Sequence, residues 1–114
     1  MATGLDFYIK QGDTYPPLIA ILKDADGNIV PLTEGDSVRF HMARKSGGQV
    51  IVNAEAEIID GPAAKVSYGN PWASGDTKDA GNFPAEFEVT FEDGGIQTFP
   101  NPLNITVHVT KAVA

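Results

Sequence analysis

The clearest pattern in the chain is a strict alternation of apolar and polar side chains over residues 83–92. Successive side chains of a β-strand point to opposite faces, so this pattern predicts a strand with one buried face and one face toward solvent. The predicted buried face carries Phe83, Ala85, Phe87, Val89 and Phe91, and the other carries Pro84, Glu86, Glu88, Thr90 and Glu92.

Shorter segments elsewhere repeat this pattern and are separated by residues that favour turns. The turns fall at residues 24–28 and 93–95, where Gly and Asn tolerate a positive φ. Residues 18–23 are apolar on both faces, which favours a central strand covered on both sides or a strand near an assembly contact. The other strands that we expect cover residues 5–10, 36–44, 65–68, 96–99 and 103–109, and residues 49–60 supply one or two more.

This pattern predicts an all-β fold of seven to nine mostly antiparallel strands. Two packed sheets are expected, because one flat sheet of this size would leave an apolar face in water. The length of 114 residues fits one domain with a single core. We therefore expect one β-sandwich spanning residues 1–114, with an ordered core of about residues 5–110.

The start of the long alternating segment reads Asp79-x-Gly81-x-Phe83-x-Ala85. This spacing resembles the Asp-x-Gly-x-Tyr-x-Cys entry to strand F of immunoglobulin-type sandwiches, which implies an immunoglobulin-like fold. Phe83 has no phenol oxygen for a tyrosine corner, and Ala85 excludes a disulfide between the sheets.

The immunoglobulin order places the strand at residues 36–44 beside the one at 83–92. Arg39 and His41, on the outward face of the first strand, then lie across from Glu86 and Glu88 on the second.

Acidic residues outnumber basic ones by 15 to 8, which gives a formal net charge of −7. Binding to nucleic acid or to an anionic membrane is therefore disfavoured, and we expect neither partner. The acidic excess is greatest in residues 76–93, which form either a solvated surface or a docking face for a basic partner.

Cysteine is absent, so we expect neither disulfides nor thiolate metal sites. The N-terminus lacks the basic and apolar regions of a signal peptide, and the longest apolar run, residues 17–22, is too short to span a bilayer. We expect a soluble protein made in a cytoplasm.

The sequence predicts no metal or cofactor site. Asp24, Asp26 and Asn28 echo the first ligands of a calcium loop. The sixth position of such a loop would be Ile29 in place of Gly, and the twelfth Gly35 in place of Glu. A plain turn is the favoured interpretation.

No catalytic residues are predicted either, and we expect a protein that is not an enzyme. His41 and His108 lie on predicted outward faces without a partner at a motif spacing. Glu86 and Glu88 share one face of a strand, but nothing in the sequence predicts a cleft around them.

Short motifs in a fixed order along nearly the whole chain carry a further resemblance. They are Ile9-x-x-Gly12-Asp13-Thr14-x-Pro16, Leu22-x-Asp24-x-Asp26-Gly27-x-x-Val30-x-Leu32-Thr33, Val38-x-Phe40-x-Met42, Val66-x-Tyr68, Trp72, Asp76-Thr77, Gly81-x-Phe83-x-Ala85-Glu86-Phe87, Asp93-Gly94 and Thr98-Phe99-Pro100. Together they resemble the N-terminal immunoglobulin-like module of phage baseplate upper proteins, although members of that family continue into helical and receptor-binding regions.

That resemblance implies a virion structural protein of the baseplate or tail, or of the head or neck. Its partners would be other virion proteins and further copies of itself in the assembled particle, after synthesis in the host cytoplasm. The expected mechanism is assembly through edge strands and loops. The residues predicted to make these contacts are Tyr15, Pro16, Pro17, Ile19 and Trp72.

The aromatic residues leave a second function open, a carbohydrate-binding module for host attachment. Trp72, Tyr68, Tyr8 and Tyr15 would then stack on sugar rings. In the other interpretation, Trp72 closes one end of the sandwich beneath the loop at residues 69–82.

Overall fold

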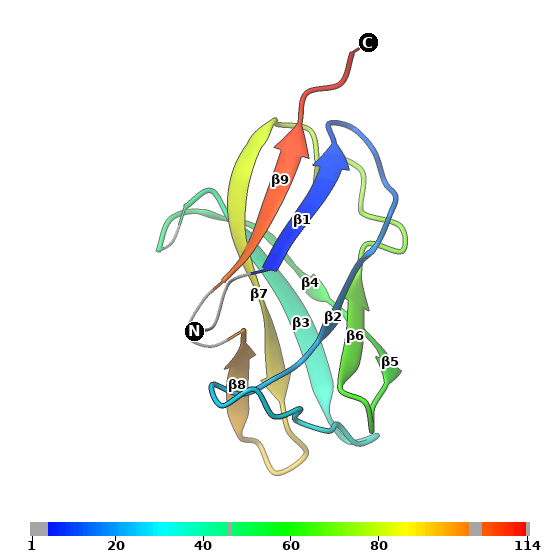
Figure 1. Ribbon diagram of the computed structural model, residues 1–114, viewed down its shortest axis with the longest axis vertical. Coiled ribbons are helices and arrows are strands. Elements are labelled where there is room, and N and C mark those ends of the chain that lie inside the picture. The colour runs from blue at the N-terminus through cyan, green and yellow to red at the C-terminus, as the bar shows by residue number, and fades with distance from the viewer. Residues whose placement is uncertain (1–4, 46, 101–103, 114) are drawn as a thin grey trace.

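Strands form where the sequence alternates, and they build two sheets packed face to face (Figure 1). The computed structural model describes residues 5–45, 47–100 and 104–113. Within these residues, no helix is present and nothing is long and apolar enough to cross a membrane as a helix. The strands are β1 (Leu5–Lys10), β2 (Leu18–Ile21), β3 (Ser37–Ala43), β4 (Val50–Glu55), β5 (Glu57–Asp60), β6 (Lys65–Tyr68), β7 (Gly81–Thr90), β8 (Ile96–Phe99) and β9 (Ile105–Thr110).

The larger sheet has six strands in the order β1-β9-β7-β3-β4, with β8 also pairing with β7. The smaller sheet has three strands in the order β2-β6-β5. Strands β1 and β9 are parallel, and the other neighbours are antiparallel. The predicted all-β, immunoglobulin-like sandwich is confirmed.

The long strand β7 organises the larger sheet. Its first half pairs with β9 and its second half with β8, so these two short strands follow one another along the same side of β7. On its other side β7 pairs with β3, where Arg39 lies opposite Glu88 and His41 opposite Glu86. The prediction that these two strands lie side by side is therefore confirmed.

The core lies between the two sheets and follows the alternation closely. Every second residue of β7 is buried from Phe83 to Val89, while the residues between them are half-buried on the outer face. Aromatic rings fill one part of this core, where Phe40 stacks on Tyr68 at 4.5 Å between centroids and contacts Phe87 at 5.3 Å.

The prediction of a central strand at residues 18–23 is wrong. β2 lies at the edge of the smaller sheet and pairs only with β6. Leu18 and Ala20 point into the core, whereas Ile19 and Ile21 are exposed. In β2, hydrophobic residues on both faces therefore belong to an edge strand whose outer face is apolar and exposed.

Candidate functional site

The five residues predicted to make contacts divide into two environments. Tyr15 and Ile19 are exposed, at 57% and 52%, and Pro16 is exposed beside a half-buried Pro17. Trp72 is only 1% exposed and is not a surface contact, so that part of the prediction is wrong. The alternative interpretation, in which Trp72 fills the sandwich interior, fits the structure.

Trp72 is held by aromatic rings and by the crossing segment between β1 and β2. Its ring stacks on Phe7 at 5.8 Å and meets Tyr68 edge-on at 5.0 Å. Its indole Nε1 donates a hydrogen bond to the Pro16 carbonyl oxygen at 2.9 Å, and its backbone N–H bonds to the Thr14 carbonyl oxygen. Neither Trp72 nor the buried Tyr68 can stack on a sugar ring, so the predicted carbohydrate platform is not formed.

The buried Tyr68 side chain forms one short hydrogen bond through its hydroxyl. Its hydroxyl donates to Asp76 Oδ2 at 2.6 Å. Burial, followed by this bond and the nearby negative charge, raises the pKa of Tyr68 well above its ordinary value of 10.0.

We expect this raised pKa to weaken the fold at alkaline pH. Above about pH 10 the unfolded chain releases the Tyr68 proton while the folded chain keeps it, so the free energy of unfolding falls as the pH rises. Urea denaturation between about pH 8 and pH 11 measures this slope. The slope should flatten in Tyr68→Phe and stay unchanged in the exposed control Tyr15→Phe; equal slopes in all three proteins would contradict the assignment.

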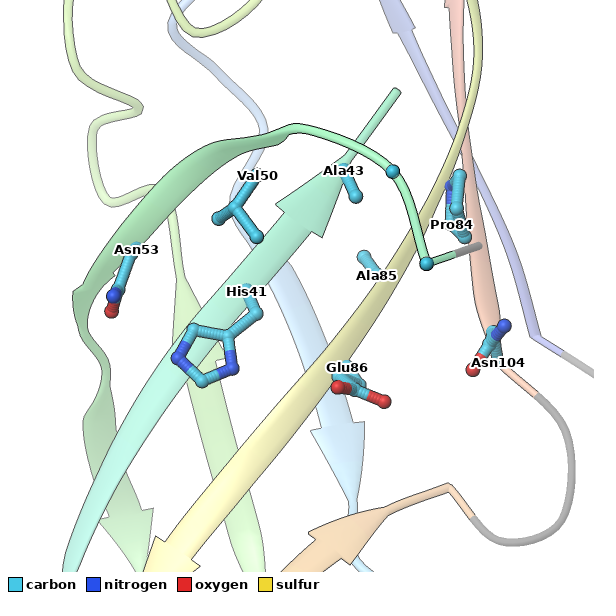
Figure 2. Close-up of a pocket in the computed structure, with 10 residues that line it drawn as sticks. His41, Ala43, Val50, Asn53, Pro84, Ala85, Glu86 and Asn104 are labelled. Carbon is cyan, nitrogen blue, oxygen red and sulfur yellow. The ribbon is translucent and has the colours of Figure 1, made fainter. Parts of the chain in front are cut away.

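A polar groove lies on the outer face of the larger sheet, and Figure 2 shows its lining. His41 pairs with Asn53 on one side and with Glu86 on the other. Asn104 precedes Ile105, which pairs with Ala85, so it continues the row beyond Glu86. An amide, an imidazole, a carboxylate and a second amide thus follow one another across adjacent strands.

The groove exists because the ladder between β3 and β7 stops there. Pro84 has no N–H to donate, and the last pair between these strands is Met42 with Ala85. A bulge lies between Met42 and Ala43, and the β3–β4 hairpin curves toward β7 beyond it (Figure 2). Gly47 and Gly48 of this hairpin line the groove. The resulting cavity measures about 380 Å³.

Glu86 in this groove carries a charge that no neighbour balances. Arg39, the nearest cation along β3, instead donates from Nε to Asn53 Oδ1 at 2.9 Å and from Nη2 to the Asn53 carbonyl oxygen at 3.1 Å. Within the described residues, neither the Glu86 nor the His41 side chain forms a hydrogen bond or an ion pair. The sequence predicted both residues on the surface but gave no sign of the groove, which depends on the hairpin above it.

A second, apolar groove of about 710 Å³ runs along β2 where the two sheets are open to solvent. Ile19 and Ile21 line it from β2, and Leu5, Phe99 and Ile105 line it from the larger sheet. Its far end is formed by the turn at residues 24–27, where Asp24 Oδ1 accepts hydrogen bonds from the N–H groups of Asp26 and Asn28. The predicted turn at residues 24–28 is therefore present.

His108 of β9 contacts side chains of β1 and β7, its two neighbours in the larger sheet. One ring nitrogen lies 2.8 Å from Asp6 Oδ1 and the other lies 2.8 Å from Asn82 Oδ1. The Tyr8 ring stacks on the imidazole at 4.4 Å between centroids. In the part of the chain that the structure describes, no group of three or more His, Cys, Asp or Glu side chains is placed to hold a metal ion.

Comparison with known proteins gives a likeness in fold. No family model and no curated protein matches the chain. The chain resembles the crystal structure of CopC from Methylosinus trichosporium OB3b with a TM-score of 0.51 and 12% sequence identity, over 97% of this chain and 89% of that one. At this identity the likeness shows the fold, a β-sandwich.

The prediction of a phage virion structural protein is corrected by this result. The chain is similar in fold to CopC, and this likeness names no component of a virion.

Proposed function

We propose that this protein is a non-enzymatic interaction domain that joins the β2 edge of one copy to the β2 edge of a second copy. The observation that carries this proposal is a row of backbone groups on β2 that have no partner among the described residues, beside exposed apolar side chains. Exposed apolar surface next to an unpaired edge is the arrangement that favours strand addition.

The ladder between β2 and β6 fixes which backbone groups are unpaired. The Leu22 N–H bonds to the Ala64 carbonyl oxygen, so the antiparallel pattern turns the N–H and C=O groups of Ala20 toward β6. The same alternation turns those of Ile19 and Ile21 away from the sheet. Both residues therefore offer a donor and an acceptor to an incoming strand.

Native edges are usually shielded by charged side chains, by prolines or by a covering segment. β2 contains no charged residue, and its two outward side chains, Ile19 and Ile21, are 52% and 41% exposed. Leu5, which is 47% exposed, widens this apolar surface. In a protein with a net charge of −7, such an uncharged surface is where two copies approach with the least repulsion.

In an antiparallel pair of β2 strands with its two-fold axis at Ala20, the outward N–H and C=O groups of Ile19 and Ile21 all find partners. Ile19 then lies opposite Ile21 of the partner subunit, and the N–H of each bonds to the C=O of the other. The contact is self-complementary, as a two-fold interface requires.

The proposal that the domain is not an enzyme rests on the lining of the polar groove. His41 and Glu86 lie side by side there. No Ser, Thr, Cys, Lys or Tyr side chain is among the described residues that line this groove. An imidazole and a carboxylate without a nucleophile beside them support binding in preference to catalysis.

We expect reversible dimers with a dissociation constant on the order of 100 μM, because the contact is short. Ile21→Pro removes the outward N–H and leaves the ladder to β6 intact. Two hydrogen bonds are lost per dimer, each contributing about 1 kcal/mol, so dimerisation should weaken about thirtyfold. Sedimentation equilibrium measures this change.

Two further variants complete the test. Ile19→Lys places like charges across the two-fold axis and should also weaken dimerisation. Ile59→Lys is the matched control, because Ile59 is 45% exposed in the same sheet but lies on β5 at the opposite edge. A chain that remains monomeric up to about ten times the expected dissociation constant, or dimers that all three variants leave unchanged, would refute the proposal.

A further inference from the structure

We propose that the polar groove on the outer face of the larger sheet binds a primary ammonium group, such as a lysine side chain of another polypeptide. This site is separate from the β2 edge, since it lies on β3, β4 and β7 of the other sheet. It therefore stands independently of the proposed dimer.

The row of side chains supplies hydrogen-bond acceptors at the spacing that an ammonium needs. Glu86 lies in the middle, with His41 on one neighbouring strand and Asn104 on the other side. Strands in a sheet are about 4.8 Å apart, so a group above the Glu86 carboxylate is within reach of the imidazole and the amide oxygen. An ammonium has three donors and no acceptor, which matches these three side chains.

Charge favours a cation over an anion or a neutral group. Glu86 is half-buried on the outer face, and within the described residues no cation lies within ion-pair distance of its carboxylate. A partly desolvated carboxylate without a hydrogen-bond partner is stabilised most by a positively charged hydrogen-bond donor. The same carboxylate would repel phosphate or carboxylate ligands.

The walls of the groove suit the alkyl stem of a lysine side chain. Ala43, Val50 and Pro84 provide apolar surface beside the polar row. Gly47 and Gly48 of the β3–β4 hairpin line the groove without side chains that would fill it. A lysine side chain packs its methylenes on apolar surface while its ammonium stays hydrogen-bonded.

The test is an NMR titration of the full chain with small amines, followed through the ring signal of His41. The His108→Gln variant assigns the two histidine signals. N-acetyl-lysine methylamide should shift the His41 signal saturably, whereas N-acetyl-norleucine methylamide, which lacks the ammonium, should not. Alanine methylamide carries its ammonium on the backbone, as a chain N-terminus does. It should shift the His41 signal less than the lysine derivative if the groove binds a lysine side chain.

Glu86→Gln and Glu88→Gln are a matched pair of variants. Both residues are half-buried on the same face of β7, but only Glu86 lines the groove. Glu86→Gln should weaken binding of the lysine derivative about tenfold or more, and Glu88→Gln less than about twofold. Equal shifts with the norleucine derivative, tighter binding of acetate, or equal losses in the two variants would overturn the proposal.

Discussion

Replacing Trp72 with alanine will lower the free energy of unfolding by about 4 kcal/mol, the largest single-residue effect that we expect in this protein. The indole is 1% exposed and touches the rings of Phe7, Phe40 and Tyr68. Its removal leaves a cavity among side chains from both sheets. The Pro16 carbonyl oxygen also loses the hydrogen bond that it accepts from Nε1.

The effect reaches beyond the cavity because Trp72 helps to anchor the segment that crosses between the sheets. The Gly12 N–H bonds to the Thr77 carbonyl oxygen, and Thr77 Oγ1 donates to the Asp13 carbonyl oxygen at 2.8 Å. With the two bonds of Trp72 to Thr14 and Pro16, these contacts tie the crossing segment to the loop after β6. Loss of the indole should therefore loosen the entry to β2.

Urea denaturation followed by circular dichroism measures this loss, since the variant has no tryptophan fluorescence. Tyr15→Ala is the control, because Tyr15 belongs to the same crossing segment but is 57% exposed. Its effect should stay within about 0.5 kcal/mol. A loss below about 1.5 kcal/mol for Trp72→Ala would mean that the indole is not part of the folded core.

The second large effect will come from Gly69→Ala, with a loss of about 3 kcal/mol in the free energy of unfolding. Gly69 has a φ of +93°, a conformation that L-residues adopt only with strain. A Cβ there would also overlap the Trp72 ring, whose Nε1 would lie 2.3 Å away. The glycine is thus required both by its backbone and by its packing against the indole.

Gly75→Ala separates these two causes. Gly75 has nearly the same φ, +95°, but an added Cβ would meet nothing within 4 Å, so this variant reports the backbone strain alone. Chemical denaturation should show that Gly69→Ala loses more than Gly75→Ala, and that the excess shrinks in a Trp72→Phe background. Equal losses at the two glycines would exclude a packing role for Gly69.

The candidate sites show where sequence reasoning falls short. The contact residues Tyr15 and Ile19 were predicted on the surface and lie there, but Trp72, the most conspicuous aromatic residue, is buried. A lone tryptophan in an irregular segment gives no alternation from which to assign a face. Its burial follows from the loop that carries it, whose backbone bonds to Thr14.

The alternation of side chains by itself determined that this is an all-β sandwich, and it placed His41 and Glu86 on one outer face. That follows from a local property, since each strand residue faces opposite to the next. Which strand lies at an edge, and where a strand stops pairing, was decided only by tertiary structure. Among the described residues β2 pairs with β6 alone, and this leaves the backbone groups of Ile19 facing outward. The groove at Glu86 depends on the β3–β4 hairpin and on the end of the β3–β7 ladder at Ala85. Pairing joins residues far apart in the chain, so no local pattern encodes it.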